Sequence, residues 1–382
     1  MKKIIITAIF IKLTVFLIIF LAYNLLPTNL SGHYLNFLYP NNQRVTLLSA
    51  YKTWDAQHFL FLSEKGYSKD QISNQFLPLL PLTISAVSVI TRNSFFTGML
   101  VSNIASLIAF YFLYKLVNLL HGKKIAFDSL IFLFAFPVSF YLSLIYTESI
   151  FLALVCSSFY FLYKRNYLLV ALISFFIPLE RIVGVFIIIP FVTFYVFEEK
   201  QFTLKSQVAD IVKSFLSKKF ILLFTPLLGF LSYFIYIFSK TGNPFALFDA
   251  LRYSVIKTSV FYMLKPLSFL QFLFSNITLH GFNTSIIDRL FLLFFLIMLY
   301  PIYKKTNKTF FVYSLIMGLF FILVGMTMSY TRHLLIVFPV FVTLAILLKD
   351  EKYNYLKFSL IYFMLMLQGL FLVMHALNYW VA

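Results

Sequence analysis

The chain is poor in charged residues and has almost no cysteine. Charged residues make up 12% of its 382 positions, against about 25% in soluble domains. The single cysteine, Cys156, lies in an apolar run, which excludes an internal disulfide and a Cys-x-x-Cys motif, and we interpret it as a packing residue. A Walker-type loop and a Gly-x-Gly-x-x-Gly fingerprint are also missing, so the sequence predicts no nucleotide cofactor.

What is present is apolar. Hydrophobic residues account for 61% of the chain, and phenylalanine alone for 51 positions. A hydrocarbon core about 30 Å thick is spanned by about 20 helical residues, so the chain can supply roughly ten spans. We therefore predict an all-α polytopic membrane protein with one domain, residues 1–382, surrounded by membrane lipids. The net charge of +18 then reflects the positive-inside rule, and we expect no nucleic-acid partner.

The hydrophobic pattern predicts eleven spans. Residues 1–26 resemble a secretory signal, but no cleavage site follows, and we interpret them as a retained first helix. Pro78 and Pro81 are expected to break the apolar run 75–90, leaving a juxtamembrane or re-entrant piece. The expected helices are 4–26, 95–119, 125–145, 149–163, 167–179, 183–197, 220–238, 289–303, 309–328, 334–348 and 355–378.

The charge of the loops fixes the expected orientation. With residues 75–90 not crossing, the basic loops 121–124, 164–166 and 304–308 all face the inner side, as short Lys/Arg-rich loops do. Residues 27–94 then form a long first extracytoplasmic loop and 239–288 a second one, while 198–219 is a basic inner loop. If 75–90 crossed instead, those three basic loops would face outward.

Polar residues from distant parts of the chain are predicted to share the outer face. Each of these residues also has a non-functional interpretation. A tryptophan can mark the membrane interface, and an acid can cap a helix or interact with its dipole. Adjacent Glu and Arg residues can neutralise each other, and an arginine can extend to the lipid headgroups. One Asp and one His are a weak metal signal, and we predict no metal site. The candidates are Trp54, Asp55, His58, Glu64, Glu148, Glu180, Arg181, Asn243, Arg332 and His333.

This collection of groups favours one kind of substrate. Arginine can clamp a phosphate, and a carboxylate can take a proton from an attacking hydroxyl. Together with an apolar helical wall, they suit a molecule with a lipid tail, a phosphate and a polar head.

The sequence also resembles the PIG-V family (GPI mannosyltransferase 2-like) of membrane mannosyltransferases, from about residue 50 onward. The motifs that carry the resemblance occur in order: "TWDAQHF", "EKGYS", "FLPLLP", "YTESIF", "LERIVG", "TGNPFALF", "YTRHLLIVFPVFVTLA" and "NYWVA". The family belongs to the GT-C class. The resemblance therefore implies a bundle of about eleven transmembrane helices, an acid in the first outer loop, and a polyprenyl-phosphate sugar donor.

The resemblance also implies roles for individual residues. Asp55 matches the acid of the Trp-Asp motif and would be the general base. Glu148, Arg181 and Arg332 match polar positions that would line the donor phosphate and sugar pocket, with His333 beside them. Supporting positions would be Trp54, His58, Glu64, Glu180 and Asn243. The chain departs from the family pattern at Phe59, Ile182, Asn243, Thr331 and His333, which leaves the sugar and the acceptor open.

We therefore expect a glycosyltransferase that moves a hexose, mannose in the first instance, to an acceptor hydroxyl with inversion. The acceptor is a glycan, a glycolipid or a protein, and a partner subunit is compatible with the sequence. The size and Lys-, Ile- and Phe-rich composition favour a bacterial plasma membrane; in a eukaryote it would be the endoplasmic reticulum. The alternatives are a lipid-linked-sugar flippase or transporter, whose charges usually lie near the bilayer midplane, and a structural subunit.

Overall fold

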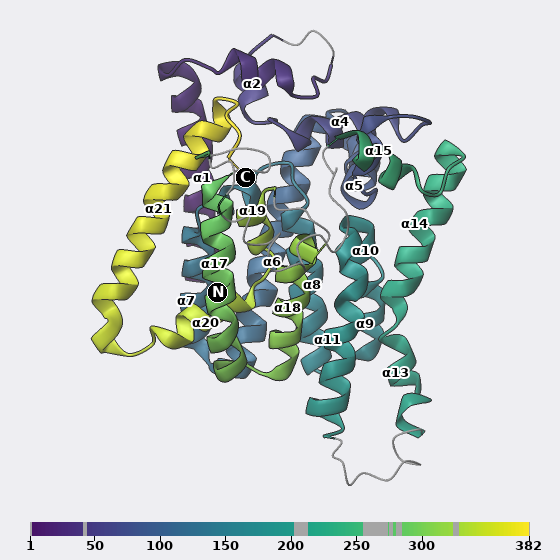
Figure 1. Ribbon diagram of the computed structural model, residues 1–382, viewed down its shortest axis with the longest axis vertical. Coiled ribbons are helices and arrows are strands. Elements are labelled where there is room, and N and C mark those ends of the chain that lie inside the picture. Colours follow the sequence, from purple (N-terminus) through teal and green to yellow (C-terminus); the bar gives the residue numbers. More distant parts are fainter. Residues whose placement is uncertain are drawn as a thin grey trace.

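The computed structural model describes residues 2–40, 44–201, 213–254, 274, 278–279, 285–323 and 328–381. In these ranges the regular structure is helical, apart from one isolated bridge between Thr278 and Ser285. Figure 1 shows a bundle of helices with short helices gathered at one end. That end carries α2 (Leu30–Leu35), α4 (Asp55–Lys65) and α15 (Ala246–Ser254), and we call it the α4 end.

Six helical stretches among the described residues are long and apolar enough to cross a membrane. They support the prediction of an all-α membrane protein, whereas the count of eleven spans stays a prediction. The six are Lys3–Leu25 in α1 (Lys2–Leu25), Ser94–His121 (α6), Ile182–Glu199 (η3, α11 and η4), Lys218–Thr241 (α13 and α14), Ile286–Lys305 (α17) and Glu351–Ala376 (η6 and α21).

Shorter helices complete the bundle. Their bounds are α7 (Lys123–Ala135), η2 (Ser139–Ser143), α8 (Glu148–Tyr163), α9 (Tyr167–Ser174), α10 (Ile177–Glu180), α18 (Lys308–Leu323), α19 (Tyr330–Leu334) and α20 (Pro339–Leu347). The composite stretches divide into η3 (Ile182–Ile187), α11 (Ile188–Thr193), η4 (Phe194–Glu199), α13 (Lys218–Leu222), α14 (Thr225–Thr241), η6 (Glu351–Tyr353) and α21 (Asn354–Ala376).

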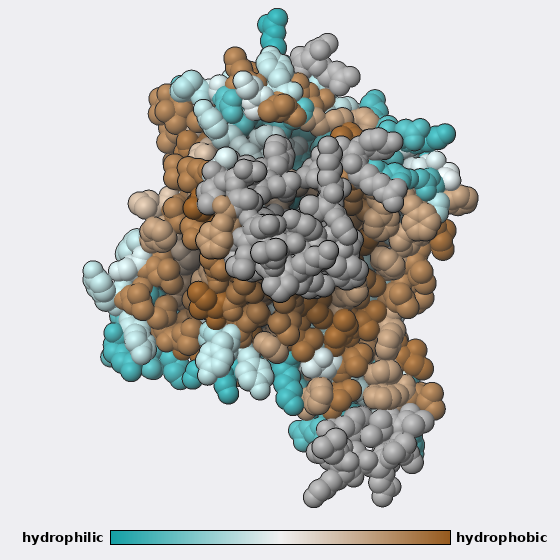
Figure 2. Space-filling model, in the orientation of Figure 1, coloured by the Kyte–Doolittle hydropathy of each residue, from teal (hydrophilic) through white to brown (hydrophobic). Residues whose placement is uncertain are grey.

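The surface has the pattern of a membrane protein. In Figure 2 hydrophobic residues cover most of the coloured surface between the two ends of the molecule, and hydrophilic residues gather at the α4 end and along the lower left edge. Many large apolar side chains of the long helices are exposed, such as Phe10 at 69% and Ile235 at 73%. Lipid tails can cover such side chains, whereas water cannot do so favourably.

The predicted first outer loop, 27–94, contains several short helices. Besides α2 and α4 these are α3 (Leu47–Ala50), η1 (Ile72–Gln75) and α5 (Leu79–Thr91). The other two predicted loops are described only in part. Residues 202–212 of the loop 198–219 lie outside the described residues, and so does most of 239–288 after α15.

The prediction that two prolines break the run 75–90 is wrong. Pro78 is the N-cap of α5 and Pro81 lies in its first turn, where a missing backbone N–H removes no helical hydrogen bond. The helix runs unbroken to Thr91 and ends at Arg92, whose φ is 54°. Its 13 residues are too few to span a bilayer without tilting or thinning, so a juxtamembrane or re-entrant helix stays our prediction.

Two predicted spans are interrupted. The expected helix 125–145 ends at Ala135 because Phe136 precedes a proline and is extended, with a ψ of 135°. The chain continues as the short 3-10 helix η2. The expected helix 334–348 is interrupted near its start, since α19 ends at Leu334 and the rest of the span forms one helix, α20, only from Pro339 to Leu347.

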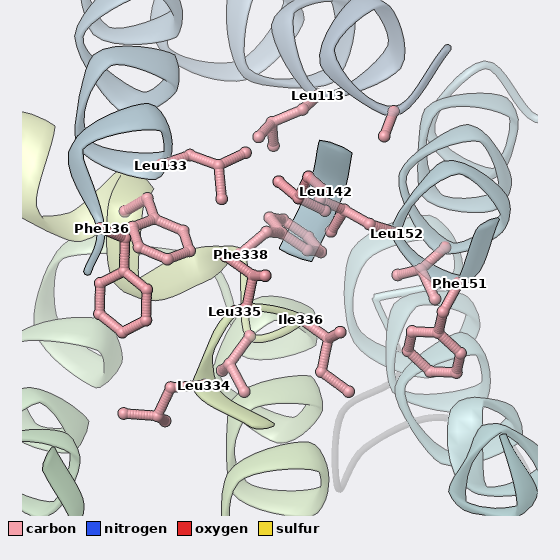
Figure 3. Packing of buried hydrophobic residues seen from close by; sticks show 14 of the residues in the cluster. Leu113, Leu133, Phe136, Leu142, Phe151, Leu152, Leu334, Leu335, Ile336 and Phe338 are labelled. Carbon is pink, nitrogen blue, oxygen red and sulfur yellow. The ribbon is translucent and has the colours of Figure 1, made fainter. Parts of the chain in front are cut away.

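These interruptions lie within the apolar core. Figure 3 shows Phe136, Leu142 and Phe338 among the packed apolar side chains of this core, and they come from the segments around α7, η2 and α20. All three are at most 2% exposed. The core thus fixes η2, which precedes Glu148 in the chain, and the segment between α19 and α20, which follows Arg332.

Candidate functional site

A cavity of about 510 Å³ opens near the α4 end. Seven of the predicted residues line it, although they come from segments up to about 280 positions apart: Trp54, Asp55, His58, Glu180, Arg181, Arg332 and His333. Glu148, with a side chain that is 0% exposed, contacts two of them from behind. The structure therefore brings together eight of the ten predicted residues.

The Trp-Asp pair sits where the chain turns into α4. Trp54 is the N-cap of this helix and has a φ of 53°, a region that non-glycine residues seldom adopt. Such a conformation costs roughly 1–3 kcal/mol and is common at functional sites. It places Asp55 in the first turn, with 26% of the side chain exposed. The Trp54 ring packs edge-to-face on Trp380, with ring centroids 4.9 Å apart.

Four charged side chains form a continuous network. Arg332 donates from Nη1 to Asp55 Oδ2 at 2.6 Å and from Nε to Glu148 Oε1 at 2.5 Å. The same Glu148 oxygen accepts a hydrogen bond from Arg181 Nη2. Glu148 is thus a buried counter-ion shared by two guanidinium groups, and only Asp55 at the end of the network is substantially exposed.

Two tyrosines support the guanidinium of Arg332. Its Cζ lies 4.5 Å from the ring centroid of Tyr146 and 4.9 Å from that of Tyr141, the arrangement of a cation–π contact. The Tyr146 hydroxyl also donates to the backbone oxygen of Thr53 at 2.8 Å. One side chain therefore positions both the arginine and the chain that leads to Asp55.

Arg332 is held from its own helix as well. Ser329, the N-cap of α19, has a φ of 59°, and Asp288 Oδ1 accepts from both the backbone N–H and the hydroxyl of Thr331 at 2.8 Å. An acid at this helix start satisfies a backbone N–H that would otherwise be unpaired. Asp288, buried in α17, thus holds Thr331 in place, and Thr331 directly precedes Arg332.

Arg181 depends on a close packing of backbone segments. It lies extended between α10 and η3, and its Nε donates to Thr147 Oγ1 at 3.0 Å. The close approach of η3 to α10 needs a glycine at position 184, because a Cβ there would lie 2.8 Å from the backbone carbonyl of Ile177. The final glycine of "LERIVG" therefore has a steric role in placing the arginine.

The two histidines of the site differ in their partners. His58 Nδ1 lies 2.8 Å from Ser73 Oγ, and the ring stacks on Phe37 at 4.3 Å. Burial lowers the pKa of His58 to about 4, although the Asp55 carboxylate acts in the opposite direction. His333 Nδ1 lies 3.4 Å from Arg181 Nη1. At neutral pH His58 is therefore uncharged and joins η1 to α4 rather than adding charge to the cavity.

Two predicted residues do not line this cavity. Glu64, at the far end of α4, accepts hydrogen bonds from the Tyr39 hydroxyl at 2.6 Å and from Ser94, so it fastens the start of α6. Asn243 donates to Asp249 Oδ2 at 2.7 Å and accepts from the backbone of Phe245, which orders the start of α15. We interpret both as structural in this region.

Several residues of the site were missed by sequence reasoning. Thr147 had a signal, because it directly precedes Glu148. Tyr146 had the same signal, as the first residue of "YTESIF", whereas Tyr141 had none in a chain with 25 tyrosines and 51 phenylalanines. His375, 2.5 Å from Thr53 Oγ1, and Asp288 lie more than 230 positions from Asp55.

The charged groups of the cavity can bind an anion next to a partly exposed carboxylate. Within the described ranges, no group of three or more His, Cys, Asp or Glu side chains is arranged to hold a metal ion. Comparison with known proteins gives no relative: no family model matches the chain, and no curated protein matches it in sequence. The resemblance to the PIG-V family accordingly stays a prediction.

Proposed function

We propose that the protein is a membrane glycosyltransferase of the GT-C class, similar to the PIG-V family, with about eleven spans. It transfers a hexose, mannose in the first instance, from a polyprenyl-phosphate carrier to an acceptor hydroxyl on the extracytoplasmic side of the membrane. The observation that carries the proposal is the network Asp55–Arg332–Glu148–Arg181 at the cavity. It combines a carboxylate that can accept a proton with two arginines that can hold a phosphate.

In the proposed reaction the acceptor oxygen attacks the anomeric carbon of the donor from the face opposite the phosphate. The bond between that carbon and the phosphate oxygen breaks, and its electron pair leaves with the lipid phosphate. Asp55 takes the hydroxyl proton, so the new glycosidic bond forms with inversion. Arg332 and Arg181 stabilise the charge that grows on the departing phosphate.

The ion pair between Asp55 and Arg332 fits this sequence of events. Without substrate, Asp55 Oδ2 is occupied by the Arg332 guanidinium at 2.6 Å. A donor phosphate would compete for the same guanidinium. Its arrival would free Asp55 Oδ2 to accept the hydrogen bond of the acceptor hydroxyl.

The surroundings of the cavity support a lipid-linked donor. The helices that lead away from the site carry exposed apolar side chains along their length, and hydrophobic residues cover most of the coloured surface between the two ends in Figure 2. A polyprenyl tail can lie against such a surface while the phosphate stays at the α4 end. A water-soluble nucleotide sugar would gain nothing from it.

The alternative, a lipid-linked-sugar flippase or transporter, is favoured by one observation. Lys12 lies at the middle of α1, only 7% exposed, and its Nζ donates to Leu142 O at 2.9 Å on the interrupted segment η2. Ionisable groups at broken helices within a membrane are common in transporters. One such contact is outweighed by the four-residue charge network at the α4 end.

The test is transfer of labelled mannose from polyprenyl-phosphate-mannose in membranes that contain the wild type, Asp55→Asn or Glu64→Gln. We expect transfer by the wild type and Glu64→Gln and its loss, at least a thousandfold, in Asp55→Asn at equal protein level. Full activity of Asp55→Asn would remove this residue as the base. If no variant transfers mannose or another hexose from this carrier, the enzyme proposal fails and the flippase alternative takes its place.

A further inference from the structure

A second cavity, of about 340 Å³, lies between η1 and α15 at the α4 end, and we call it the η1–α15 cavity. This volume falls within the range of about 300–1,000 Å³ of small-molecule sites. Seven of its ten lining residues are polar: Lys69, Asp70, Gln71, Asn74, Thr241, Asn243 and Asp249. The other three are Ile72, Ala246 and Ala250.

Two amide oxygens in its wall lack a donor. Asn74 is 1% exposed and donates from Nδ2 to Ser68 O at 2.8 Å, yet its Oδ1 accepts no hydrogen bond from any residue that the structure describes. The buried Oε1 of Gln71 is likewise unsatisfied by that part of the chain. Buried polar atoms normally have partners, so a pair of orphaned acceptors in one cavity points to a ligand that donates hydrogen bonds.

The remaining polar groups are already oriented. Asn243 Nδ2 donates to Asp249 Oδ2 at 2.7 Å, and Thr241 Oγ1 accepts from the backbone N–H of Asn243 at 3.1 Å. The cavity therefore presents amide and carboxylate oxygens on a fixed frame. The two acids Asp70 and Asp249 outnumber the one base, Lys69, and so disfavour an anion such as phosphate. A neutral molecule rich in hydroxyl groups can satisfy several acceptors at once.

The cavity adjoins the candidate site. Ile72 lines both, and α15 separates them, with Leu251 on the Asp55 side and Asp249 and Ala250 on the other. A chain of sugars held in the η1–α15 cavity would therefore have a neighbouring unit at Asp55.

We propose that the η1–α15 cavity binds a hexose unit of a carbohydrate, through hydroxyls that donate to Gln71, Asn74 and Asp249. Carbohydrate binding follows from the cavity alone. Its assignment to the acceptor rests on the proposed function, and makes the acceptor a glycan or glycolipid with a sugar next to the one that is modified.

The binding test uses the full chain in lipid nanodiscs, since sugar-headed detergents would compete. Methyl α-mannoside and α-linked mannobiose are the probes, measured by saturation-transfer NMR. Ala250→Leu fills the cavity and Gln71→Met removes an acceptor at constant size. Phe248→Leu is the matched control, because Phe248 lies in the same helix, is 40% exposed and does not line the cavity.

We expect the NMR signal in the wild type, Phe248→Leu and Asp55→Asn, and a reduction of at least fivefold in both cavity variants. Two variants are used because Ala250→Leu alone could act through misfolding. A signal that is absent from the wild type, or unchanged in Gln71→Met and Ala250→Leu, overturns the proposal. The proposal is also overturned if the cavity binds Ca²⁺ in place of sugar. In that case the wild type would bind Ca²⁺ tightly, Gln71→Met would not, and neither sugar probe would give an NMR signal.

The acceptor role is tested separately by steady-state transfer. In Gln71→Met the KM for a glycan acceptor should rise at least fivefold, with kcat and the KM for the donor unchanged. An unchanged acceptor KM refutes the acceptor role while leaving transfer intact. If no hexose transfer exists but the sugar signal follows the variants, the proposed function fails and the carbohydrate site stands.

Discussion

Asp55 and Arg332 lie 277 positions apart in the chain and are joined by a hydrogen bond of 2.6 Å. The pair is the point at which a short helix at the end of the bundle is tied to the segment that follows α18. Because Glu148 holds the same arginine from the buried side, the guanidinium is fixed while the carboxylate remains accessible.

Arg332→Lys should lower transfer at least tenfold and raise the KM for the donor. A lysine is a point charge and cannot donate from two fixed positions to Asp55 and Glu148, as the guanidinium does. The measurement is donor-dependent transfer kinetics, with the exposed Arg92→Lys as control. A donor KM equal to that of the wild type would place Arg332 outside the phosphate site.

Glu148→Gln should destabilise the protein by roughly 3–5 kcal/mol, because two buried guanidinium groups lose their shared counter-ion. Equilibrium unfolding in SDS measures this loss, and Glu64→Gln, at an exposed acid, should change stability by less than about 1 kcal/mol. Equal effects of the two substitutions would mean that the buried network adds no particular stability.

Gly184→Ala should lower the rate of hexose transfer by more than its loss of folding stability explains. The added Cβ would lie 2.8 Å from the Ile177 carbonyl, so α10 and η3 must separate and carry Arg181 with them. Overpacking of this kind costs about 1–3 kcal/mol. Gly369→Ala is the control, since a Cβ there meets nothing within 4 Å and alanine favours the helix by roughly 0.5–1 kcal/mol. Wild-type activity in Gly184→Ala would show that the close contact does not position Arg181.

Acid should weaken the contact between α4 and η1 through protonation of His58. Burial lowers its folded-state pKa to about 4, below the usual 6.5, so the unfolded state binds the proton more readily. The stability from neutral His58 is therefore complete above pH 6.5 and is lost as the pH falls from 6.5 to about 4. The shift corresponds to about 3 kcal/mol, at roughly 1.4 kcal/mol per pH unit.

The check is hydrogen exchange in α4 and η1 at pH 7 and pH 4.5, for the wild type and His58→Asn. Asparagine can keep the hydrogen bond to Ser73 but does not titrate. The expected result is a lower protection factor at pH 4.5 in the wild type alone, after correction for the slower intrinsic amide exchange at acid pH. An identical pH response in both proteins would assign the effect to another group.

The sequence allowed the polar part of the site to be predicted because polarity is rare in this chain. Asp55, Glu148, Arg181 and Arg332 stand out among apolar neighbours, and the structure gathers them. The residues that shape the site could not be found in this way. Tyr146 is one aromatic residue among many, and its role depends on Thr53 and Arg332 lying on either side of it.

Helix ends were predictable where glycine or charged residues mark them and less so at proline. Pro81 and Pro137 look alike in sequence, yet α5 contains the first and α7 ends before the second. The difference is the position within the turn: near a helix start proline removes nothing, whereas further along it removes a hydrogen bond. Only tertiary packing decides where each helix begins.

The contact between Thr53 and His375 spans 322 positions, and α2 is similarly tied to the end of α21 by Asn36 and Asn378. A ribosome that adds about 5–20 residues per second needs on the order of tens of seconds to make that intervening stretch. The segment carrying Asp55 must therefore wait, already translocated in the proposed topology, until α21 has been made and has entered the membrane. The newborn chain would complete the candidate cavity only after that step.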